Sequence, residues 1–434
     1  MKTIEIDFDR LDALCEYNPR RYPFLLESVN HNRDNRYSIL FAHPGESMRL
    51  NQLDEFDFLE RLSEQVALAP NIESELPFVG GYFVYLSYEL AGQIEPILAK
   101  DLALSDAPIA IATWINSAII VDHLTQTSYL LDIEDDAQRI AQILSDIEAL
   151  PSSIEALEAL RVSPTCEPGQ KFLDGVSQVK RYIKAGDVFQ VNLSRQWDVQ
   201  LSAQRSDAQL YQQLKQANPA PFSALAQFET FSIISSSPER LFSVDGETIQ
   251  TRPIAGTHPR GSGEEDEALK RQLISHPKER SEHIMLLDLE RNDLGRVCEY
   301  GSVVVDDVMF LETYPYVHHI VSNITGKLRK GVGVAEIVRA LFPGGTITGC
   351  PKVRCMQIIA ELEHMPRAAY TGSLGYISCN NKMDFNILIR TMTKRGDNLS
   401  FRAGAGIVFD SIAERELEET VHKAQGILKL FTQG

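Results

Sequence analysis

Residues 401–431 read FRAGAGIVFDSIAERELEETVHKAQGILKLF, and this stretch decides the fold class. Its first four residues, 401–404, have the composition of a strand, whereas 413–431 has the periodicity of a helix. Apolar residues recur in the second part at spacings of four, three, four and three and so form a single stripe, made by Leu417, Val421, Ala424, Leu428 and Phe431. The stretch therefore predicts a strand that is followed by an amphipathic helix.

Outside this stretch, predicted strands and helices are mixed without a regular alternation. We expect strands at 82–86, 117–121, 231–234 and 302–305, and helices at 53–67, 172–185 and 357–363. A regular strand–helix alternation would indicate a parallel, doubly wound sheet, so its absence favours an α+β layer architecture. The segment 161–170, RVSPTCEPGQ, is rich in turn formers and suggests a boundary between a region 1–160 and a region 170–434.

The composition is globular and acidic. Among 434 residues there are 42 Lys+Arg and 60 Asp+Glu, which gives a formal net charge of −18. This balance argues against nucleic-acid or anionic-membrane partners, because both require a basic surface. The apolar region 107–121 is too short to span a bilayer, and the six dispersed cysteines contain no C-x-x-C pair. With no signal-peptide pattern at the start, we expect a soluble, cytoplasmic protein with reduced thiols.

Two acidic pairs have the spacing of a metal site. Glu279 and Glu282 are three residues apart, as are Glu416 and Glu419, which puts each pair on one face of a helix. If the two helices face each other, the carboxylates would suit Mg²⁺, which favours one or two carboxylates together with waters and substrate oxygens. The alternative is two solvated helix faces, because a chain with 60 acids contains such pairs by chance.

Glycine-rich turns gather in the C-terminal half, at 253–257, 343–352 and 404–406. The second has the G-x-x-x-x-G spacing of a phosphate loop, but Cys350-Pro351 interrupts it and the proline lacks an N–H group, so we expect no ATP site. Backbone N–H groups beside Lys352 could instead bind a carboxylate. Plain turn chemistry is the alternative for each of these loops.

Two further positions are open to a structural and a functional interpretation. Arg390 closes the apolar run 387–389, where burial is costly unless an anion pairs with it, either a structural carboxylate or one of a substrate. His318 and His319 lie among apolar and tyrosine neighbours, a setting more typical of hydrogen-bonded core histidines than of catalysts. The H-E-x-x-H and G-x-S-x-G signatures of zinc and serine hydrolases do not occur in the sequence.

Short motifs follow one another in a specific order between residues 172 and 431. They are GDVFQVNLSR (186–195), SSPER (236–240), RPIAGT (252–257), DLERNDLGR (288–296), VHHIVS (317–322), the loop 342–352 and GAGIV (404–408). In this order they resemble the chorismate-utilising enzyme family. The resemblance implies an α+β fold in which two antiparallel sheets pack together with helices outside, and Mg²⁺ as the cofactor.

Within that family, four stretches look like the aminodeoxychorismate synthase component I subfamily: PFSA (221–224), SPER (237–240), VHH (317–319) and FPGG (342–345). This implies amination of chorismate at C4 to give 4-amino-4-deoxychorismate, a precursor of 4-aminobenzoate and folate. One residue departs from the subfamily, because Ala255 stands where a lysine acts as a covalent nucleophile on the ring. The segment PIAGT is that of anthranilate synthase component I, which forms anthranilate and pyruvate and is the alternative.

The resemblance also assigns roles to individual residues. It implies Glu239 as general acid, His319 beside the reacting ring, and Glu282 and Glu419 as Mg²⁺ ligands with Glu279 and Glu416 in support. The residues that would bind chorismate are Gly256, Thr257, Lys352, Tyr370 and Arg390, together with the backbone of Gly404, Ala405 and Gly406. A regulatory binding protein without activity is a third reading, and the retention of these residues argues against it.

Gln190 is the position that separates ammonia from water as the attacking group. Isochorismate-forming relatives have a lysine there that activates water, which a glutamine cannot do. The sequence has no glutamine-amidotransferase signature, so ammonia should come from a separate glutamine amidotransferase subunit. A tryptophan pocket is also implied, at Ser28 and at Pro221, Phe222 and Ser223.

Overall fold

The computed structural model describes the chain except for residues 30–34, 152–159, 203, 314–316 and 433–434, and except for the side chains of 255, 257–259, 277, 278 and 317. Apart from one short parallel pair, its strands form one antiparallel network that divides at a long strand, β5 (Ala110–Asp122). The first half of β5 pairs with β4 (Gly81–Leu86), and its second half pairs on the same edge with β6 (Thr127–Asp132). The network therefore continues from β5 as two sheets.

The first sheet begins with β1 (Lys2–Ile6) and continues through β6, β5, β3 (Tyr37–Leu50) and β2 (Phe24–Glu27). It then passes through β10 (Phe222–Gln227), β11 (Ser232–Ser237), β20 (Thr391–Arg395) and β21 (Asn398–Ile407) to β9 (Gln190–Gln200). The outer edge of β9 carries β8 (Thr165–Cys166) and β17 (Gly349–Cys350). The second runs from β5 through β4, β18 (Ser373–Ser378), β19 (Lys382–Asn386), β12 (Arg240–Asp245) and β13 (Thr248–Thr251) to β16 (Val317–Lys327), which also pairs with β14 (Ile254–Pro259) and β15 (Val304–Thr313). A separate parallel pair joins β7 (Leu160–Arg161) to β22 (Phe431–Thr432).

The two sheets pack face to face through an aromatic core. Phe24 of the first sheet stacks on Phe83 of the second with ring centroids 4.1 Å apart, and Phe41 meets the same ring edge-on at 5.2 Å. Ala224 and Tyr376 belong to the same buried cluster, one from each sheet. Side chains alternate along a strand, so the opposite face of each sheet is left for helices.

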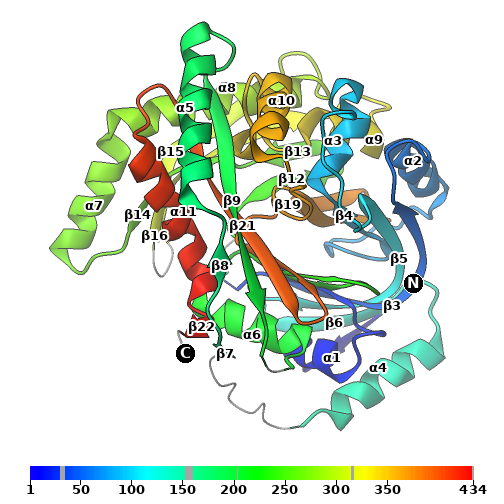
Figure 1. The fold of residues 1–434 in the computed structure, drawn as a ribbon. Helices are drawn as coiled ribbons and strands as arrows, with labels where there is room; N and C mark the ends of the chain where they lie inside the picture. Colours follow the sequence, from blue (N-terminus) through cyan, green and yellow to red (C-terminus); the bar gives the residue numbers. More distant parts are fainter. Residues whose placement is uncertain (30–34, 152–159, 203, 314–316, 433–434) are drawn as a thin grey trace.

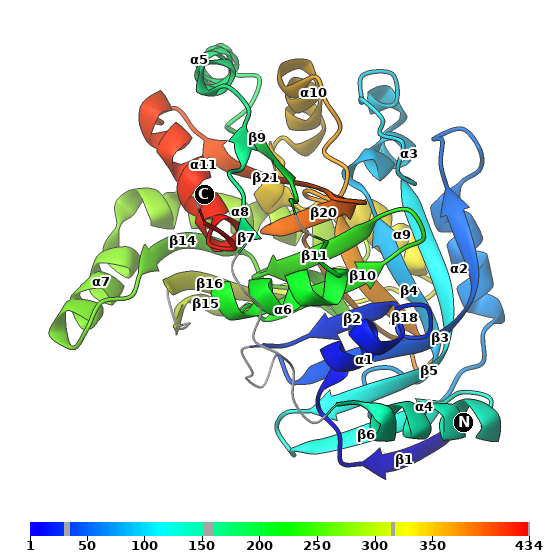
Figure 2. The ribbon, with the colours of Figure 1, turned by 60° about the horizontal axis from the view of Figure 1, so that its bottom comes forward.

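Helices cover those outer faces. The first sheet is covered by α1 (Leu11–Tyr17), α4 (Ala137–Ala149), α6 (Asp207–Ala217) and α11 (Ala413–Leu428), and the second by α2 (Phe58–Leu68), α8 (Pro277–Gly295) and α9 (Val334–Leu341). Two more, α5 (Gly169–Ala185) and α10 (Lys352–Glu363), pack on β9 together with the short α3 (Ala91–Ile94), whereas α7 (Glu264–Ser275) lies beside β14. Figure 1 shows α5, α10 and α11 around β9 and β21, and Figure 2 brings α1, α4 and α6 forward.

The α+β class and the packed antiparallel sheets are thus confirmed, while several element ends differ from those expected. The helix expected at 53–67 begins at Phe58, because the Asp57 carboxylate caps it by accepting from the Glu60 N–H at 3.1 Å. The strand expected at 302–305 begins at Val304 and runs to Thr313. The stripe on 413–431 belongs to α11 as far as Leu428, and Phe431 pairs in β22.

The boundary suggested at 161–170 separates stretches of sequence that share both sheets. In the first sheet β2 pairs with β10, and in the second β4 pairs with β18. The division into 1–160 and 170–434 stays a prediction. Among the described residues, no helix is long and apolar enough to cross a bilayer.

Candidate active site

Strands β9 and β21 approach the acidic face of α8 at one place. The Gln190 side chain on β9 donates from Nε2 to Oε1 of Glu282 at 2.8 Å. Glycines on β21 make room there: a Cβ at Gly406 would lie 2.2 Å from Gln190 Nε2, and one at Gly404 would lie 2.7 Å from Tyr370 Oη. Ala405 points the other way into the core beneath α5 and α10, because side chains alternate along a strand. The expected contribution of 404–406 is through the backbone, so the direction of the Ala405 side chain leaves that prediction open.

Glu239 is a buried carboxyl group with the proton affinity of an acid catalyst. It lies in the turn between β11 and β12, is 5% exposed, and accepts a hydrogen bond from Thr346 Oγ1 at 2.8 Å. Burial raises the pKa of Glu239 to about 7, although the Thr346 hydroxyl and the charge of Arg390 both favour the carboxylate. A group of this kind holds a proton near neutral pH and can release it.

Arg390 lies close to this carboxyl group, and His319 lies close to Arg390. Burial lowers the pKa of Arg390, and the Glu239 carboxylate opposes that effect. No described residue accepts a hydrogen bond from the Arg390 guanidinium. The backbone of Arg390 has a φ of 52°. Burial and the Arg390 charge lower the pKa of His319 to about 3, so its ring is neutral at physiological pH. A guanidinium in this setting is suited to bind a carboxylate brought by a ligand.

The four expected metal ligands lie on two helices, as predicted. Glu279 and Glu282 are on α8, while Glu416 and Glu419 are on α11. Glu419 pairs with Lys423 of its own helix at 2.8 Å. Desolvation opposes the charge of Lys423, but the carboxylate of Glu419, with smaller contributions from Tyr370 and Glu282, outweighs it and raises the pKa of Lys423. Both carboxylates thus act on one ammonium group, which brings the two helix faces together.

The other two expected metal ligands, Glu279 and Glu416, have surroundings different from those of Glu282 and Glu419. A Cβ at Gly256 would lie 2.9 Å from Glu279 Oε2, so this glycine gives the carboxylate space. Glu416 is 4% exposed and therefore faces the protein interior. Within the described part of the chain, no group of three His, Cys, Asp or Glu side chains is arranged as a metal site. The acids present offer carboxylate oxygens for a cation that takes its other ligands from water and substrate.

Lys352 has a partner of its own. Its Nζ donates to Asp293 Oδ2 at 2.6 Å, and both side chains are largely buried. This anion already satisfies the ammonium group, which argues against the expected contact with a substrate carboxylate. The backbone at Ala255 and Thr257 pairs with β16, but their side chains lie outside the described residues.

His318 has the structural role that its surroundings suggested. It is buried, its Nε2 lies 2.8 Å from Asp266 Oδ1, and its Nδ1 lies 2.9 Å from Thr313 Oγ1. His318 and His319 are adjacent on β16 and so point to opposite faces, which gives the neighbouring histidines different partners.

A buried ion cluster supports Tyr370 from behind. Glu363 accepts from both Arg367 and Arg402, at 2.7 and 3.1 Å from the nearer oxygens. Arg367 also lies over the Tyr370 ring, 5.4 Å from its centroid. The arginine charges outweigh burial and lower the pKa of Glu363 to about 2. This cluster joins α10 to β21 and fixes the side of the site that Tyr370 forms.

Sequence reasoning missed several residues that meet here. Lys423, Thr346, Asp293 and Glu290 were not singled out, although Lys423 follows Glu419 by four residues on one helix face. That spacing was a usable signal. The contact from Thr346 to Glu239 joins residues 107 positions apart, so only the fold reveals it.

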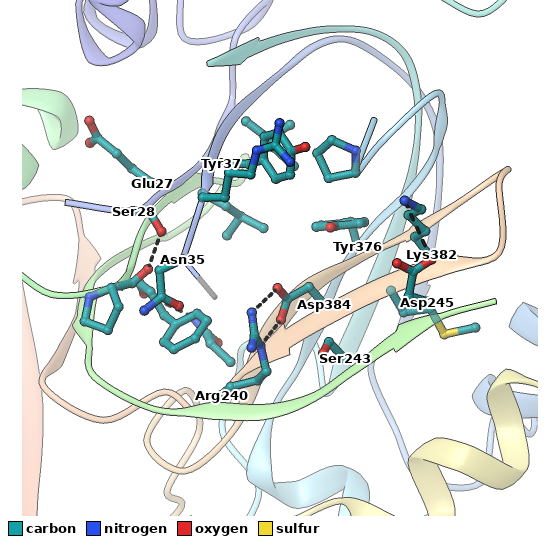
Figure 3. Close-up of a pocket in the computed structure, with 18 of the residues that line it drawn as sticks. Glu27, Ser28, Asn35, Tyr37, Arg240, Ser243, Asp245, Tyr376, Lys382 and Asp384 are labelled. Carbon is teal, nitrogen blue, oxygen red and sulfur yellow. Dashed lines mark hydrogen bonds and ion pairs between the residues drawn. The ribbon is translucent and has the colours of Figure 1, made fainter. Parts of the chain in front are cut away.

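A pocket of about 370 Å³ lies between β2, β10, β12, β18 and β19 (Figure 3). Its lining includes all four residues expected for a tryptophan pocket, Ser28, Pro221, Phe222 and Ser223. The Ser28 hydroxyl donates to the Pro221 carbonyl at 3.0 Å. Arg240 lies over the Phe222 ring and holds Asp384 through two bonds of 2.9 Å. The structure brings these residues together, and tryptophan as their ligand stays a prediction.

Comparison with known proteins gives one family. A family model described as chorismate binding enzyme matches residues 22–429. Aminodeoxychorismate synthase component 1 of Bacillus subtilis is 39% identical over 432 residues, covering 93% of this chain and 90% of the relative. Anthranilate synthase component 1 of Aquifex aeolicus is 37% identical over 405 residues, covering 88% and 80%. The crystal structure of anthranilate synthase component I from Streptococcus pneumoniae superposes with a TM-score of 0.80 at 31% identity, covering 91% of this chain and 92% of that one.

Proposed function

The chain belongs to the family of chorismate binding enzymes, and we propose that it aminates chorismate at C4 to give 4-amino-4-deoxychorismate. Relatives named aminodeoxychorismate synthase and anthranilate synthase have similar identity, so this choice rests on the subfamily motifs described above. The observation that carries the proposal is the closeness of Glu239, a carboxyl group with a pKa of about 7, to an Arg390 guanidinium that has no hydrogen-bond acceptor among the described residues.

Glu239 supplies the proton that the reaction needs. Chorismate loses its C4 hydroxyl group, and hydroxide is a poor leaving group unless it is protonated as it departs. Glu239 holds a proton near pH 7 because burial penalises its charged form. The Thr346 hydroxyl stabilises the carboxylate that remains after the proton is released.

Arg390 orients the substrate. Chorismate carries two carboxylates, and a guanidinium can bind one of them through two parallel hydrogen bonds. Because the pKa of His319 is about 3, this residue would face the ring as a neutral imidazole that does not compete for the same carboxylate. Gly404 leaves space beside the Tyr370 hydroxyl for the ring to approach.

The acids on α8 and α11 fit Mg²⁺. Glu282 and Glu419 are carboxylates that already act on one cation, Lys423, and Mg²⁺ prefers such oxygen ligands together with substrate oxygens. Glu279 and Glu416 would support them. When bound, Mg²⁺ would supply Lewis-acid stabilisation of a substrate carboxylate.

Ammonia is the nucleophile that the site favours. Gln190 is 4% exposed and donates through its Nε2 to Glu282, while its Oε1 has no hydrogen-bond partner among the residues that the structure describes. This oxygen can accept an N–H from ammonia, and a glutamine cannot act as the base that water would need. We propose that a separate glutamine amidotransferase subunit supplies the ammonia.

Anthranilate synthesis is the second candidate, and Ala255 favours it. The PIAGT segment lacks the lysine of aminodeoxychorismate synthases. In our proposal ammonia adds at C2 as the C4 hydroxyl group leaves as water, and a second ammonia then adds at C4 as the C2 amino group leaves as ammonia. No covalent enzyme intermediate forms on this route, so Ala255 is compatible with it, and loss of pyruvate after the first addition would give anthranilate instead.

Product analysis tests the proposal. The purified chain is incubated with chorismate, Mg²⁺ and excess ammonium, and products are followed by chromatography with mass detection. We expect 4-amino-4-deoxychorismate with its enolpyruvyl group intact. Anthranilate plus pyruvate would replace the proposal with the second candidate, and unchanged chorismate would contradict both.

A further inference from the structure

Glu290 is a buried carboxyl group that the reaction proposed above does not use. It lies on α8 within DLERNDLGR and is 5% exposed. The positions of Glu279, Glu282, Glu290 and Asp293 follow the helical repeat, so one face of α8 carries all four acids. Glu290 is eleven residues from Glu279 and lies toward the other end of this face.

One short loop holds both Glu290 and Glu239. The Gly345 N–H donates to Glu290 Oε1 at 3.3 Å, and the hydroxyl of the next residue, Thr346, donates to Glu239 Oε1 at 2.8 Å. Gly345 packs so closely that an added Cβ would lie 2.4 Å from Leu289 Cδ2 and 3.1 Å from Glu290 Oε1. A shift of Glu290 would therefore move the backbone that positions Thr346.

The charges around Glu290 keep it protonated. Burial and the negative charges of Asp293 and Glu239 raise the pKa of Glu290, and Lys352 offsets them only in part. Lys352 donates to Asp293 at 2.6 Å, so its charge serves that carboxylate. A second hydroxyl, that of Thr251, lies 3.4 Å from Glu290 Oε2 and makes a stronger bond of 2.9 Å to the Leu241 carbonyl. The charged groups that act on Glu290 are therefore Asp293 on α8, Lys352 on α10 and Glu239 in the β11–β12 turn.

We propose that Glu290 is a positioning residue for the acid catalyst. As an uncharged carboxyl group it holds the Gly345 backbone, and this keeps the Thr346 hydroxyl on the Glu239 carboxylate. The inference rests on the proposed role of Glu239 as the proton donor. Its consequence is specific: without Glu290, Glu239 loses a hydrogen bond that favours its charged form, and its proton is held more tightly.

The pH dependence of kcat tests this inference. In E290L the Gly345 N–H loses its carboxyl acceptor, so the pH at which kcat falls on the alkaline side of its pH profile should rise by about one unit. The variant T346V should raise this pH by the same amount. The double variant E290L/T346V should move it no further than T346V alone, because both changes remove one contact. E290Q keeps a neutral group with an oxygen acceptor and should restore the wild-type value of this pH. D288N, on the exposed side of the same helix, is the matched control.

Three outcomes would overturn the inference. The first is an alkaline fall of kcat in E290L at the same pH as in wild type. The second is a shift in the double variant equal to the sum of the two single shifts. The third is a shift in E290Q as large as that in T346V. If E290L does not fold, E290Q and T346V still decide the question. The acid role of Glu239 is checked separately with E239Q: full activity in E239Q would refute the proposed function, whatever the Glu290 variants show.

Discussion

Replacing Glu239 with glutamine should lower activity and raise stability in a pH-dependent way. Glutamine preserves the size of the side chain and removes its ionisable proton. Loss of a general acid typically costs 10²- to 10⁴-fold in rate, and we expect kcat with chorismate, Mg²⁺ and ammonium to fall by about that factor at pH 7. The same substitution removes the free-energy cost of burying a charged carboxylate, and this produces the pH-dependent gain in stability.

The size of the stability effect follows from the pKa of Glu239. Burial raises it from 4.5 to about 7, so the folded chain binds this proton more tightly than the unfolded chain does. The resulting stabilisation is fully present below about pH 4.5 and is lost as the pH rises through 7. The difference corresponds to about 3 kcal/mol in the free energy of unfolding. Relative to wild type, E239Q should therefore gain about 3 kcal/mol between pH 4 and pH 8.

Urea denaturation of both proteins at pH 4, 6 and 8 measures this gain. E229Q is a suitable control, because the Glu229 side chain is 75% exposed and its replacement should have no comparable pH dependence. A stability difference between E239Q and wild type that does not change with pH would refute the assignment of a raised pKa to Glu239. It would also remove the basis for its role as an acid at neutral pH.

Three further predictions concern the rest of the site. E363Q should destabilise the fold by roughly 3 to 5 kcal/mol in urea denaturation at pH 7, because two buried arginines lose their shared anion; a loss below about 1 kcal/mol would contradict this account. E282Q should raise the Mg²⁺ concentration needed for half-maximal activity at least tenfold. The control variant E264Q changes an exposed acid and should leave this concentration unchanged. The same Mg²⁺ dependence in E282Q and wild type would refute the metal assignment. A255K should allow a covalent adduct between the ring and the lysine, visible by intact mass after incubation with chorismate. Retained activity without any adduct would show that the site follows the direct ammonia route.

The sequence predicted the fold class because hydrophobic periodicity is a local property. The stripe on 413–431 lies in α11 as far as Leu428, and the structure has a helix or strand at each of the short apolar runs. Element ends were less accurate, since Asp57 begins α2 through a side-chain cap that competes with helix propensity. The way β4 and β6 share one edge of β5 depends on pairing between distant residues, and periodicity carries no information about it.

The candidate site shows the same division between local and long-range information. The SPER motif singled out Glu239, the end of an apolar run singled out Arg390, and the three-residue spacing singled out the two acidic pairs, because each of these signals lies in a short contiguous stretch. Burial could not be seen in those stretches, and burial is what raises the pKa of Glu239 and lowers that of His319. Lys352 was expected to bind a substrate carboxylate, and its pairing with Asp293 became visible only when α8 and α10 were brought together.

The absence of a lysine at position 255 is best understood through the lysines that are present. Lys423 lies beside Glu419 and Glu282, and their charges raise its pKa, so its amine stays protonated and cannot attack the ring. Lys352 is bound to Asp293. Neither of these amines is available as a nucleophile, whereas the Gln190 side chain offers an oxygen that can orient ammonia. In the proposed reaction Glu239 would donate the proton, Arg390 would bind a substrate carboxylate and Gln190 would accept an N–H from ammonia, and this combination would favour direct addition of ammonia over attack by the enzyme itself.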